Sequence, residues 1–398
     1  MNAPEIALFG EWNTANLGDR MIHRRAAEFF RSCGWRVSSY ALSSLVPVAE
    51  PGSAREPPPP RGRAAARLPP GLRRALRGVR QEMRMLRLLP ALARAQAIAV
   101  GGGALLSDVN LHFPQSLAVL TRAARAQGKP MLCLGCSAEG AWSPAGVGIV
   151  RRFLGACALI AARDAATARR VAELLGRSVP VFGDFCLRES DFADAGGQRA
   201  LRPALAVNVS CPPAVAARVQ HEYEDALVEM VRFSRAGPAA MHAITVFTTG
   251  TAEDAGPARR VAARLASGGA DLFLPQSVGE LEALLRSATV VVAGRLHAFV
   301  LALATRTPAV GFSPAPKLRN FLGSLGLERY GFGPDGGAEL ARLIGADRSA
   351  LWNEQRDAIR RAPLWAVRSR IHGLLRSAAS APAAQRGLLL AEAHRALA

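Results

Sequence analysis

Two series of short apolar segments, each followed by a segment of helical length, constrain the fold of this chain more than any other feature. In the first half the apolar runs occupy residues 5–9, 95–100, 131–134, 156–162 and 179–181. In the second half they occupy residues 204–209, 243–248, 271–274, 289–293 and 309–312. Alternation of buried strands with helices is typical of parallel βα units. We therefore predict an α/β fold of two doubly wound, Rossmann-like domains facing a cleft, with ligands at the carboxyl ends of the strands.

A break rich in Asp, Gly and Arg separates the two series at residues 191–203. The chain of 398 residues is long enough for two domains that each bury a core. The break predicts an N-terminal domain at 1–195 and a C-terminal domain at 196–398, the second of which ends in a helical tail.

An insertion at 51–94 interrupts the first domain and differs sharply from its surroundings. It contains four consecutive prolines at 57–60, and 11 arginines against two glutamates. Its second part, 72–92, has helical periodicity, with arginines on one side and an apolar stripe on the other, formed by Leu72, Leu76, Val79, Met83, Leu86 and Leu89. This predicts a basic amphipathic helix, which either docks on an anionic membrane surface or presents a solvated face while it packs against the domain.

Composition argues against several classes of function. Half of the residues are hydrophobic, as in globular proteins, but no apolar run is long enough to cross a membrane. The first residues lack a signal-peptide pattern and the six cysteines lie mostly in apolar segments, so we expect a cytoplasmic protein, peripheral to the inner face of the cell membrane if the basic helix docks there. The net charge of +19 comes almost entirely from arginine, as in chains from GC-rich genomes, and we expect no nucleic-acid partner.

No metal site is indicated by the sequence. Cys133 and Cys136 have the spacing of a redox or half-zinc site, but no second Cys or His pair lies at a suitable distance. We interpret this pair as the end of a buried strand. The chain also lacks a D-x-D motif and any cluster of His, Asp and Glu ligands.

The most informative stretch is the β-branched run 289–293, which ends at Gly294 and is followed by Arg295, Leu296 and His297 at the start of a helix. The first amides of a helix and its dipole favour anions. Arg295 adds a group able to grip a carboxylate or phosphate at two points, and a histidine beside bound anions is suited to donate a proton. The alternative is a capping arginine and a half-buried histidine.

Other polar groups follow strands in the same way. Lys317, one of only two lysines, lies just beyond the run 309–312. Arg163 ends the run 156–162 and either faces the cleft or forms a helix-start pair with the capping residue Asp164. Two further turns between strand and helix are the segment Asn16-Leu17-Gly18-Asp19 and the triple glycine Gly101, Gly102 and Gly103, which match neither the Rossmann fingerprint nor a P-loop.

Taken in order, the segments at 16–19, 101–108, 163–164, 183–184 and 294–298, followed by Lys317, resemble the polysaccharide pyruvyl transferase family. The similarity runs from about residue 6 to 327, and Gly-Arg-Leu-His-Ala at 294–298 is its most specific part. The resemblance implies a glycosyltransferase-B-like fold and transfer of pyruvate from phosphoenolpyruvate to a cell-surface or exopolysaccharide glycan as a ketal. It also implies that Arg295, His297 and Arg163 belong to the phosphoenolpyruvate site.

The chemistry of the residues agrees with that implication. Phosphoenolpyruvate carries a carboxylate and a phosphate, which convergent arginine, lysine and helix N-termini neutralise. We expect His297 to be the general acid, and Asp19 or Asp184 to act as base or to hold sugar hydroxyls, unless these aspartates only cap helices. We expect Asn16, Leu296, Lys317 and the glycines at 101–103 to bind substrate, and no metal or further cofactor to be needed.

Two other functions share some of these features. A glycosyltransferase of the same fold that uses a nucleotide sugar also needs a cleft that binds phosphates. A non-enzymatic, membrane-associated binding module would account for the basic insertion but not for Arg295, His297 and Lys317 together. The acceptor sugar, its hydroxyl pair, its lipid-linked or polymeric form and the oligomeric state stay open at this point.

Overall fold

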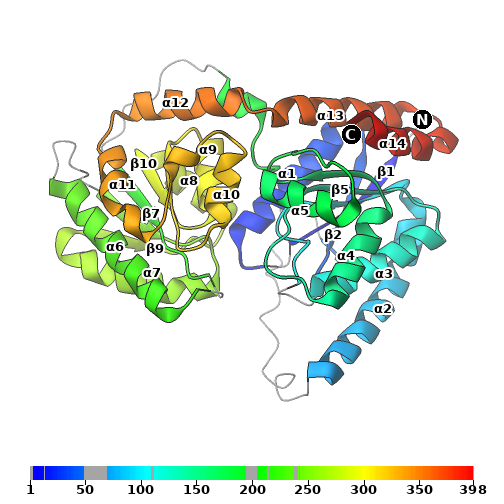
Figure 1. Ribbon diagram of the computed structural model, residues 1–398, viewed down its shortest axis with the longest axis horizontal. Helices are drawn as coiled ribbons and strands as arrows, with labels where there is room; N and C mark the ends of the chain where they lie inside the picture. Colours follow the sequence, from blue (N-terminus) through cyan, green and yellow to red (C-terminus); the bar gives the residue numbers. More distant parts are fainter. Residues whose placement is uncertain are drawn as a thin grey trace. The chain divides into compact units, whose positions relative to one another are not determined.

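The computed structural model describes residues 3–12, 14–48, 70–108, 112–193, 204–212, 215–236, 241 and 243–397. The chain forms two compact units (Figure 1). The first unit comprises Met1–Thr14, Ile22–Phe185 and Pro363–Ala398, and the second comprises Ala15–Met21 and Cys186–Ala362.

The first unit is built on a six-stranded sheet in the order β3-β2-β1-β4-β5-β6. Its strands are β1 (Glu5–Gly10), β2 (Arg36–Ala41), β3 (Val46–Pro47), β4 (Ala97–Gly101), β5 (Met131–Cys136) and β6 (Cys157–Ala162). All pairings are parallel except that of the edge strand β3 with β2. Every residue of β1, β4 and β5 is buried, as expected for parallel strands covered on both faces. Cys133 and Cys136 therefore belong to a buried strand, which confirms the interpretation from sequence.

Helices flank the strands of the first unit. They are α1 (Leu17–Ser32), α2 (Pro70–Arg94), α3 (His112–Ala126), α4 (Pro144–Gly155), α5 (Ala165–Leu175), α13 (Leu364–Ser380) and α14 (Ala383–Leu397), although the first turn of α1 belongs to the second unit. The predicted strand at 179–181 is only an isolated bridge from Val181 to Ala162.

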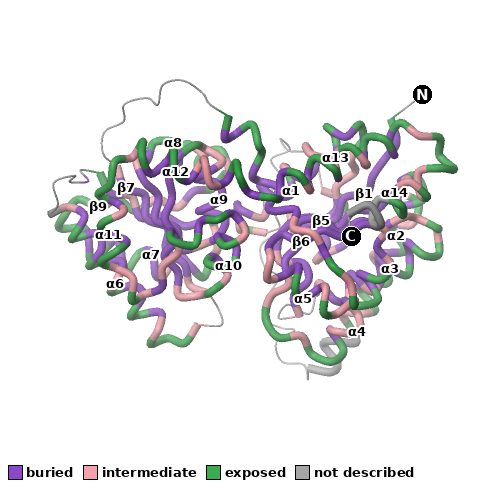
Figure 2. The backbone as a smooth tube through the Cα atoms, turned by 45° about the horizontal axis from the view of Figure 1, so that its top comes forward, coloured by how far each residue is buried: buried purple, intermediate pink, exposed green. Residues whose placement is uncertain are grey.

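The second unit contains another six-stranded sheet, in the order β12-β11-β10-β7-β8-β9, with every pairing parallel. Its strands are β7 (Ala204–Asn208), β8 (Ala243–Phe247), β9 (Ala270–Phe273), β10 (Val290–Ala293), β11 (Ala309–Phe312) and β12 (Gly331–Phe332). Its helices are α6 (Ala217–Ala236), α7 (Ala252–Leu265), α8 (Val278–Ser287), α9 (Leu296–Ala304), α10 (Lys317–Gly323), α11 (Gly337–Ile344) and α12 (Arg348–Arg360). Figure 2 shows buried backbone concentrated in the strands and exposed residues on the helices around them. The prediction of two parallel-sheet α/β units is confirmed.

The division between the units differs from the predicted boundary at 195/196. The first unit ends at Phe185, and the C-terminal helices α13 and α14 belong to it rather than to the second unit. The indole Nε1 of Trp35 donates to the carbonyl of Leu375 at 2.9 Å, and the guanidinium of Arg368 donates to the carbonyl of Asp184 at 3.0 Å. Arg368 also lies over the ring of Phe182, 4.6 Å from its centre. The helical tail is thus attached to the first unit by these contacts.

Residues 15–21 belong to the second unit, although the residues before and after them belong to the first. The amide of Leu17 donates to the carbonyl of Thr249 at 2.8 Å. Gly250 has φ +88°, and a Cβ there would lie 2.3 Å from the carbonyl oxygen of Ala15. Glycine is required at this position for both its backbone conformation and the close approach of the two chain segments.

The helix α2 includes the predicted segment 72–92 but packs through a different face from the predicted apolar stripe. Its buried residues are Gln81, Met85, Leu88 and Leu92. Four members of the predicted stripe point outward: Leu76 is 52% exposed, Val79 62%, Met83 53% and Leu86 58%. The rest of the insertion at 51–69, with its four prolines, and the side chains of Leu72, Arg73 and Arg74 lie outside the described residues. Among the helices that the structure describes, none is long and apolar enough to cross a membrane.

Candidate functional site

The carboxyl edge of the second sheet gathers the polar groups that follow β7, β8, β10 and β11. Because these strands are neighbours and parallel, their ends lie along one edge. Asn208 ends β7, Thr248 follows β8, Gly294 follows β10, and Ser313 follows β11. This is the edge at which ligands bind in open α/β sheets.

Gly294 forms a turn without room for a side chain. A Cβ at this position would lie 2.4 Å from the hydroxyl oxygen of Tyr223 and 2.7 Å from the carbonyl oxygen of Asn208. Its amide donates to that same carbonyl at 3.1 Å. Glycine therefore lets the start of α9 approach β7, and any larger residue would push the two apart.

Arg295 stands at the N-cap of α9 and is held by an acidic partner that the sequence did not reveal. Its Nε and Nη2 donate to the two carboxylate oxygens of Asp254 at 2.9 and 2.6 Å. Asp254 is fully buried, whereas the Arg295 side chain is 24% exposed. Burial lowers the pKa of Arg295, but the hydrogen bonds and charge of Asp254 outweigh it and raise the pKa above its ordinary value.

The backbone of Arg295 is fixed as well, since its amide donates to the side-chain oxygen of Asn208 at 2.9 Å. Asn208 is fully buried in an otherwise apolar strand. That single polar residue at the end of an apolar run was the signal in the sequence that could have identified Asn208 as a partner of Arg295. The Arg295 guanidinium is thus oriented by the protein before any ligand binds.

His297 and Asp19 are brought together from two predicted motifs. The imidazole Nδ1 of His297 lies 3.8 Å from a carboxylate oxygen of Asp19. His297 is only 8% exposed, and the Asp19 side chain is 22% exposed. A Cβ on Gly18 would lie 2.3 Å from the Cβ and the Nδ1 of His297, so glycine at this position makes room for the ring.

Asn16 organises the loop that carries Asp19. Its side-chain amide donates to Asp19 at 2.9 Å, and its side-chain oxygen accepts from the amide of Gly18 at 3.0 Å. The segment 16–19 is thus a capped helix start whose acidic group faces the histidine of the Gly-Arg-Leu-His-Ala segment.

Leu296 and Lys317 complete the predicted residues on this unit. Leu296 is the first residue of α9 and is only 4% exposed, so its side chain is part of the core and its contribution to a ligand is limited to its backbone. Lys317 is the first residue of α10 and half-buried, and it follows the strand β11 that pairs with β10. Both residues therefore lie along the same sheet edge as Arg295.

Arg163, in the first unit, is 1% exposed and held between two carboxylates. Its Nη2 donates to Glu139 at 3.2 Å, and its Nε lies 3.7 Å from Asp164. Asp164 also caps α5 by accepting from the amide of Thr167 at 2.8 Å. The structure thus shows the helix-start pair that the sequence offered as the alternative, and it adds Glu139, which the sequence did not single out.

Asp184 and the triple glycine also belong to the first unit. Asp184 is 1% exposed and follows Gly183, which has φ +86°. Gly102 and Gly103 both have φ +75°, and a Cβ on Gly102 would lie 2.0 Å from the side chain of Ile22. Backbone conformation and packing against α1 therefore account for Gly102 without a ligand.

The structure therefore groups Asn16, Asp19, Arg295, Leu296 and His297 in the second unit, with Lys317 on the same sheet edge. Arg163, Asp184, Gly101, Gly102 and Gly103 all lie in the first unit. Over the described part of the chain, no three His, Cys, Asp or Glu side chains are placed to hold a metal ion.

Comparison with known proteins gives one family and one fold. A family model described as polysaccharide pyruvyl transferase matches residues 16–316. No curated protein matches the chain.

Among solved structures, the chain is similar to a putative UDP-N-acetylglucosamine 2-epimerase from Listeria monocytogenes, with 12% identity, 95% of this chain and 96% of that chain covered, and a TM-score of 0.55. It is also similar to the UDP-GlcNAc 2-epimerase from Neisseria meningitidis bound to UDP-GlcNAc (10% identity, 92% and 99% covered, TM-score 0.53). A third match is the S. aureus MnaA–UDP co-structure (11% identity, 93% and 95% covered, TM-score 0.53). At such low identity the likeness shows the fold alone, which is the predicted glycosyltransferase-B-like one.

Proposed function

Because this chain belongs to the polysaccharide pyruvyl transferase family, we propose that it transfers pyruvate from phosphoenolpyruvate to a sugar of a cell-surface or exopolysaccharide glycan. The product is a ketal in which two hydroxyls of one sugar hold C2 of pyruvate. The observation that carries this proposal is the approach of Asp19 to His297 at the N-terminal end of α9.

In this proposal His297 is the general acid. Its imidazolium gives a proton to the methylene carbon of phosphoenolpyruvate, which becomes a methyl group and leaves C2 electron-deficient. One sugar hydroxyl adds to C2, phosphate leaves with the electron pair of the C2–O bond, and a second hydroxyl closes the ketal. One hydroxyl proton restores His297 and the other leaves on phosphate.

Asp19 supports the acid from the side of Nδ1. At 3.8 Å the contact is longer than a hydrogen bond, so its effect is electrostatic: the carboxylate favours the positively charged imidazole. We prefer Asp19 over Asp184 for this role because the Asp19 side chain is 22% exposed, whereas Asp184 is almost fully buried in the other unit.

The donor's anionic groups are assigned to the start of α9. The amides of its first turn have no carbonyl partner within the helix, and they point out of its N-terminus. Arg295 adds a positive charge whose orientation is fixed by Asp254, and Lys317 adds a second from the neighbouring strand end. We assign Arg163 a positioning role in its own turn, because its guanidinium is buried and paired with Glu139.

The direct test is incubation with phosphoenolpyruvate and a panel of candidate glycans. We expect release of inorganic phosphate that depends on the glycan, together with a glycan mass gain equal to one pyruvate ketal. A parallel panel of UDP-sugars tests the glycosyltransferase alternative. Sugar transfer from a UDP-sugar, with no phosphate released from phosphoenolpyruvate by any glycan, would overturn the proposal.

We also propose that α2 docks the enzyme on an anionic membrane surface, where a lipid-linked acceptor would be present. The exposed stripe of Leu76, Val79, Met83 and Leu86 lies opposite the face that packs on the domain. Arg80 and Arg87 are exposed on the same helix. An apolar stripe beside arginines is complementary to acyl chains and anionic headgroups, to which each basic residue contributes about 1 kcal/mol.

A further inference from the structure

The first unit contains a cavity that is lined by none of the residues assigned above to pyruvyl transfer. It has a volume of about 280 Å³ and lies between α1 and the strands β2 and β3. This volume is at the lower end of the range for small-molecule sites, so it suits a ligand with a single ring.

His23 of α1 lines this cavity and is 2% exposed. Neither of its ring nitrogens has a hydrogen-bond partner among the residues that the structure describes. The ring lies close to Gly10, whose added Cβ would lie 2.5 Å from Nδ1, and it contacts the indole of Trp12 edge-on. Both nitrogens are closed to solvent as the ring stands, so a ligand in the cavity reaches one of them only when the ring turns about its Cβ–Cγ bond. A buried polar group without a partner costs about 1–3 kcal/mol, which favours such a contact.

The charge state of His23 restricts the chemistry of that ligand. Burial, and to a lesser extent the charge of Arg31, lower the pKa of His23 to about 4. The imidazole is therefore neutral at physiological pH, with one nitrogen that donates and one that accepts. Hydroxyl groups also donate and accept, and they satisfy both nitrogens better than a simple anion does.

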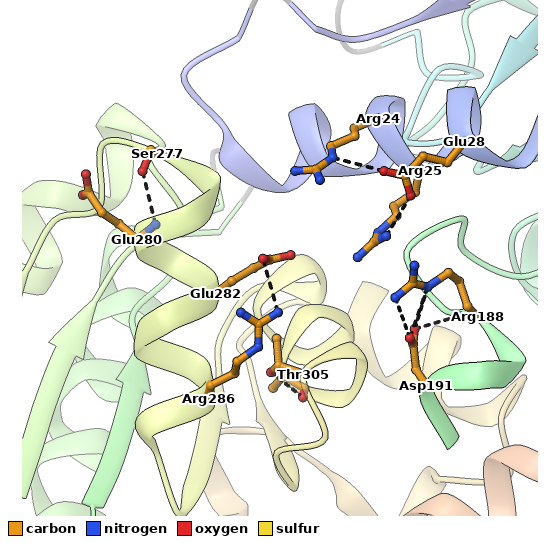
Figure 3. Close-up of polar contacts among 11 residues, drawn as sticks. Arg24, Arg25, Glu28, Arg188, Asp191, Ser277, Glu280, Glu282, Arg286 and Thr305 are labelled. Atoms are coloured by element: carbon orange, nitrogen blue, oxygen red, sulfur yellow. Dashed lines mark hydrogen bonds and ion pairs between the residues drawn. The ribbon is translucent and has the colours of Figure 1, made fainter. Parts of the chain in front are cut away.

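The other walls of the cavity fit a sugar ring that carries a negative charge. Trp12 is half-buried, and its ring centre lies 5.4 Å from that of His23, so the indole forms a flat apolar wall. Ser39 and Tyr40 of β2 also line the cavity. Arg24 and Arg31 line the cavity and carry positive charge. Figure 3 shows Arg24 directed toward Glu28, one turn further along α1, and this ion pair offsets part of the charge of Arg24.

We propose that this cavity is a carbohydrate site for one acidic or phosphorylated sugar unit. In this arrangement the neutral His23 ring turns one nitrogen toward a sugar hydroxyl, the apolar face of the sugar lies on Trp12, and the carboxylate or phosphate lies toward Arg24 and Arg31. The assignment does not depend on the transfer reaction, because none of Asp19, Arg295 and His297 lines the cavity.

The test is binding of glucuronate, glucose 6-phosphate, glucose and inorganic phosphate to the full chain, without phosphoenolpyruvate. The readout is the NMR signal of the His23 ring, assigned among the seven histidines by its loss in His23→Leu. We expect glucuronate and glucose 6-phosphate to shift this signal with a dissociation constant on the order of 1 mM, and glucose to bind more weakly. Phosphate alone should leave the signal in place.

Two variants make the proposal specific. By calorimetry, His23→Leu and Trp12→Leu should each weaken glucuronate binding by roughly tenfold or more, which corresponds to about 1.4 kcal/mol. The matched control His221→Leu removes an exposed histidine of α6, and His297→Asn removes the proposed acid; both should bind glucuronate normally. No shift by any sugar, equal shifts by phosphate and glucuronate, or unchanged affinity in both cavity variants would overturn the site. Failure of the transfer assay would not overturn the carbohydrate site.

Discussion

The carboxylate of Asp19 lies 3.8 Å from Nδ1 of His297, and the two residues come from helix starts near opposite ends of the family match. If this pair delivers the proton, His297→Asn keeps hydrogen-bonding capacity but cannot donate to carbon. We expect turnover to fall by roughly 10²–10⁴-fold while phosphoenolpyruvate affinity stays within about tenfold. Steady-state kinetics and calorimetry measure the two quantities separately.

The companion variant Asp19→Asn tests the role of the carboxylate. Without its negative charge the positively charged imidazole is less favoured, so the pH above which turnover falls should move downward. His221→Asn, on an exposed face of α6, is the control and should leave the pH–rate profile unchanged. If His297→Asn instead keeps near-normal turnover and an unshifted pH–rate profile, His297 has no part in the mechanism.

Gly18 is the residue that allows the contact between Asp19 and His297. In Gly18→Ala the new methyl group would overlap the histidine, since the added Cβ falls 2.3 Å from its Nδ1. We expect the ring to be displaced, with a loss of turnover of about 10²-fold from the misplacement of the acid.

A matched control exists in α13, where nothing lies within 4 Å of a Cβ on Gly373. Gly373→Ala should keep full activity and raise stability by about 0.5–1 kcal/mol, because alanine is the better helix former. Full activity in Gly18→Ala would mean that the contact has no catalytic role.

The ion pair between Arg295 and Asp254 predicts an effect on stability as well as on binding. Arg295→Ala leaves the fully buried carboxylate of Asp254 without its charged partner, with only the hydrogen bond from the amide of Cys211, and loss of such a partner typically costs about 3–5 kcal/mol. The double variant Arg295→Met with Asp254→Leu removes both charges and should recover much of that loss. Urea unfolding measures the stability of the single and the double variant. An Arg295→Ala protein as stable as the parent would show that the pair contributes little.

The sequence identified the strands well because parallel strands covered on both faces are continuous apolar runs, as in β1, β4 and β5. It also located the Gly-Arg-Leu-His-Ala turn, since a glycine directly after a β-branched run, followed by Arg and His, is typical of a turn at the ligand-binding edge of a sheet. The strands β2, β3 and β12 were missed, because β2 is mostly partly exposed and polar, and β3 and β12 have only two residues each.

What the sequence could not show was which sheet a helix packs against. The apolar stripe of α13 is compatible with either unit, and only contacts such as Trp35 to Leu375 place it on the first.

The acidic partners of Arg295 and Arg163 were missed for a related reason. Asp254 and Glu139 look like ordinary solvent-exposed acids in the sequence, and their role depends on contacts between distant segments.

His23 makes stability depend on pH in a defined window. Its pKa is about 4 in the folded protein and near 6.5 when exposed, so between these values the unfolded chain binds more protons. Stability from this group is therefore full above pH 6.5 and is lost as pH falls toward 4, by about 3 kcal/mol at most. We expect His23→Leu to lose this dependence, as measured by urea unfolding at pH 7, 5.5 and 4.5. Parallel pH curves for parent and variant would contradict the assignment.

The exposed face of α2 predicts salt-sensitive binding to vesicles that contain anionic phospholipid. Changing Val79, Met83 and Leu86 to Ser removes apolar surface that is 62%, 53% and 58% exposed. Because these side chains face away from the buried residues Met85 and Leu88, the fold should be retained while vesicle binding in sedimentation assays falls by roughly tenfold or more.

Charge and stripe can be separated by a second variant, Arg80→Gln with Arg87→Gln, which keeps the apolar residues. It should weaken binding at low salt and have less effect at high salt, where headgroup attraction is already screened. Phe233→Ser on α6 is the matched control, since Phe233 is 64% exposed but belongs to the second unit, and it should bind vesicles like the parent. If the parent and both α2 variants sediment equally with anionic vesicles, the outward stripe of α2 is a solvated surface and the membrane is not its partner.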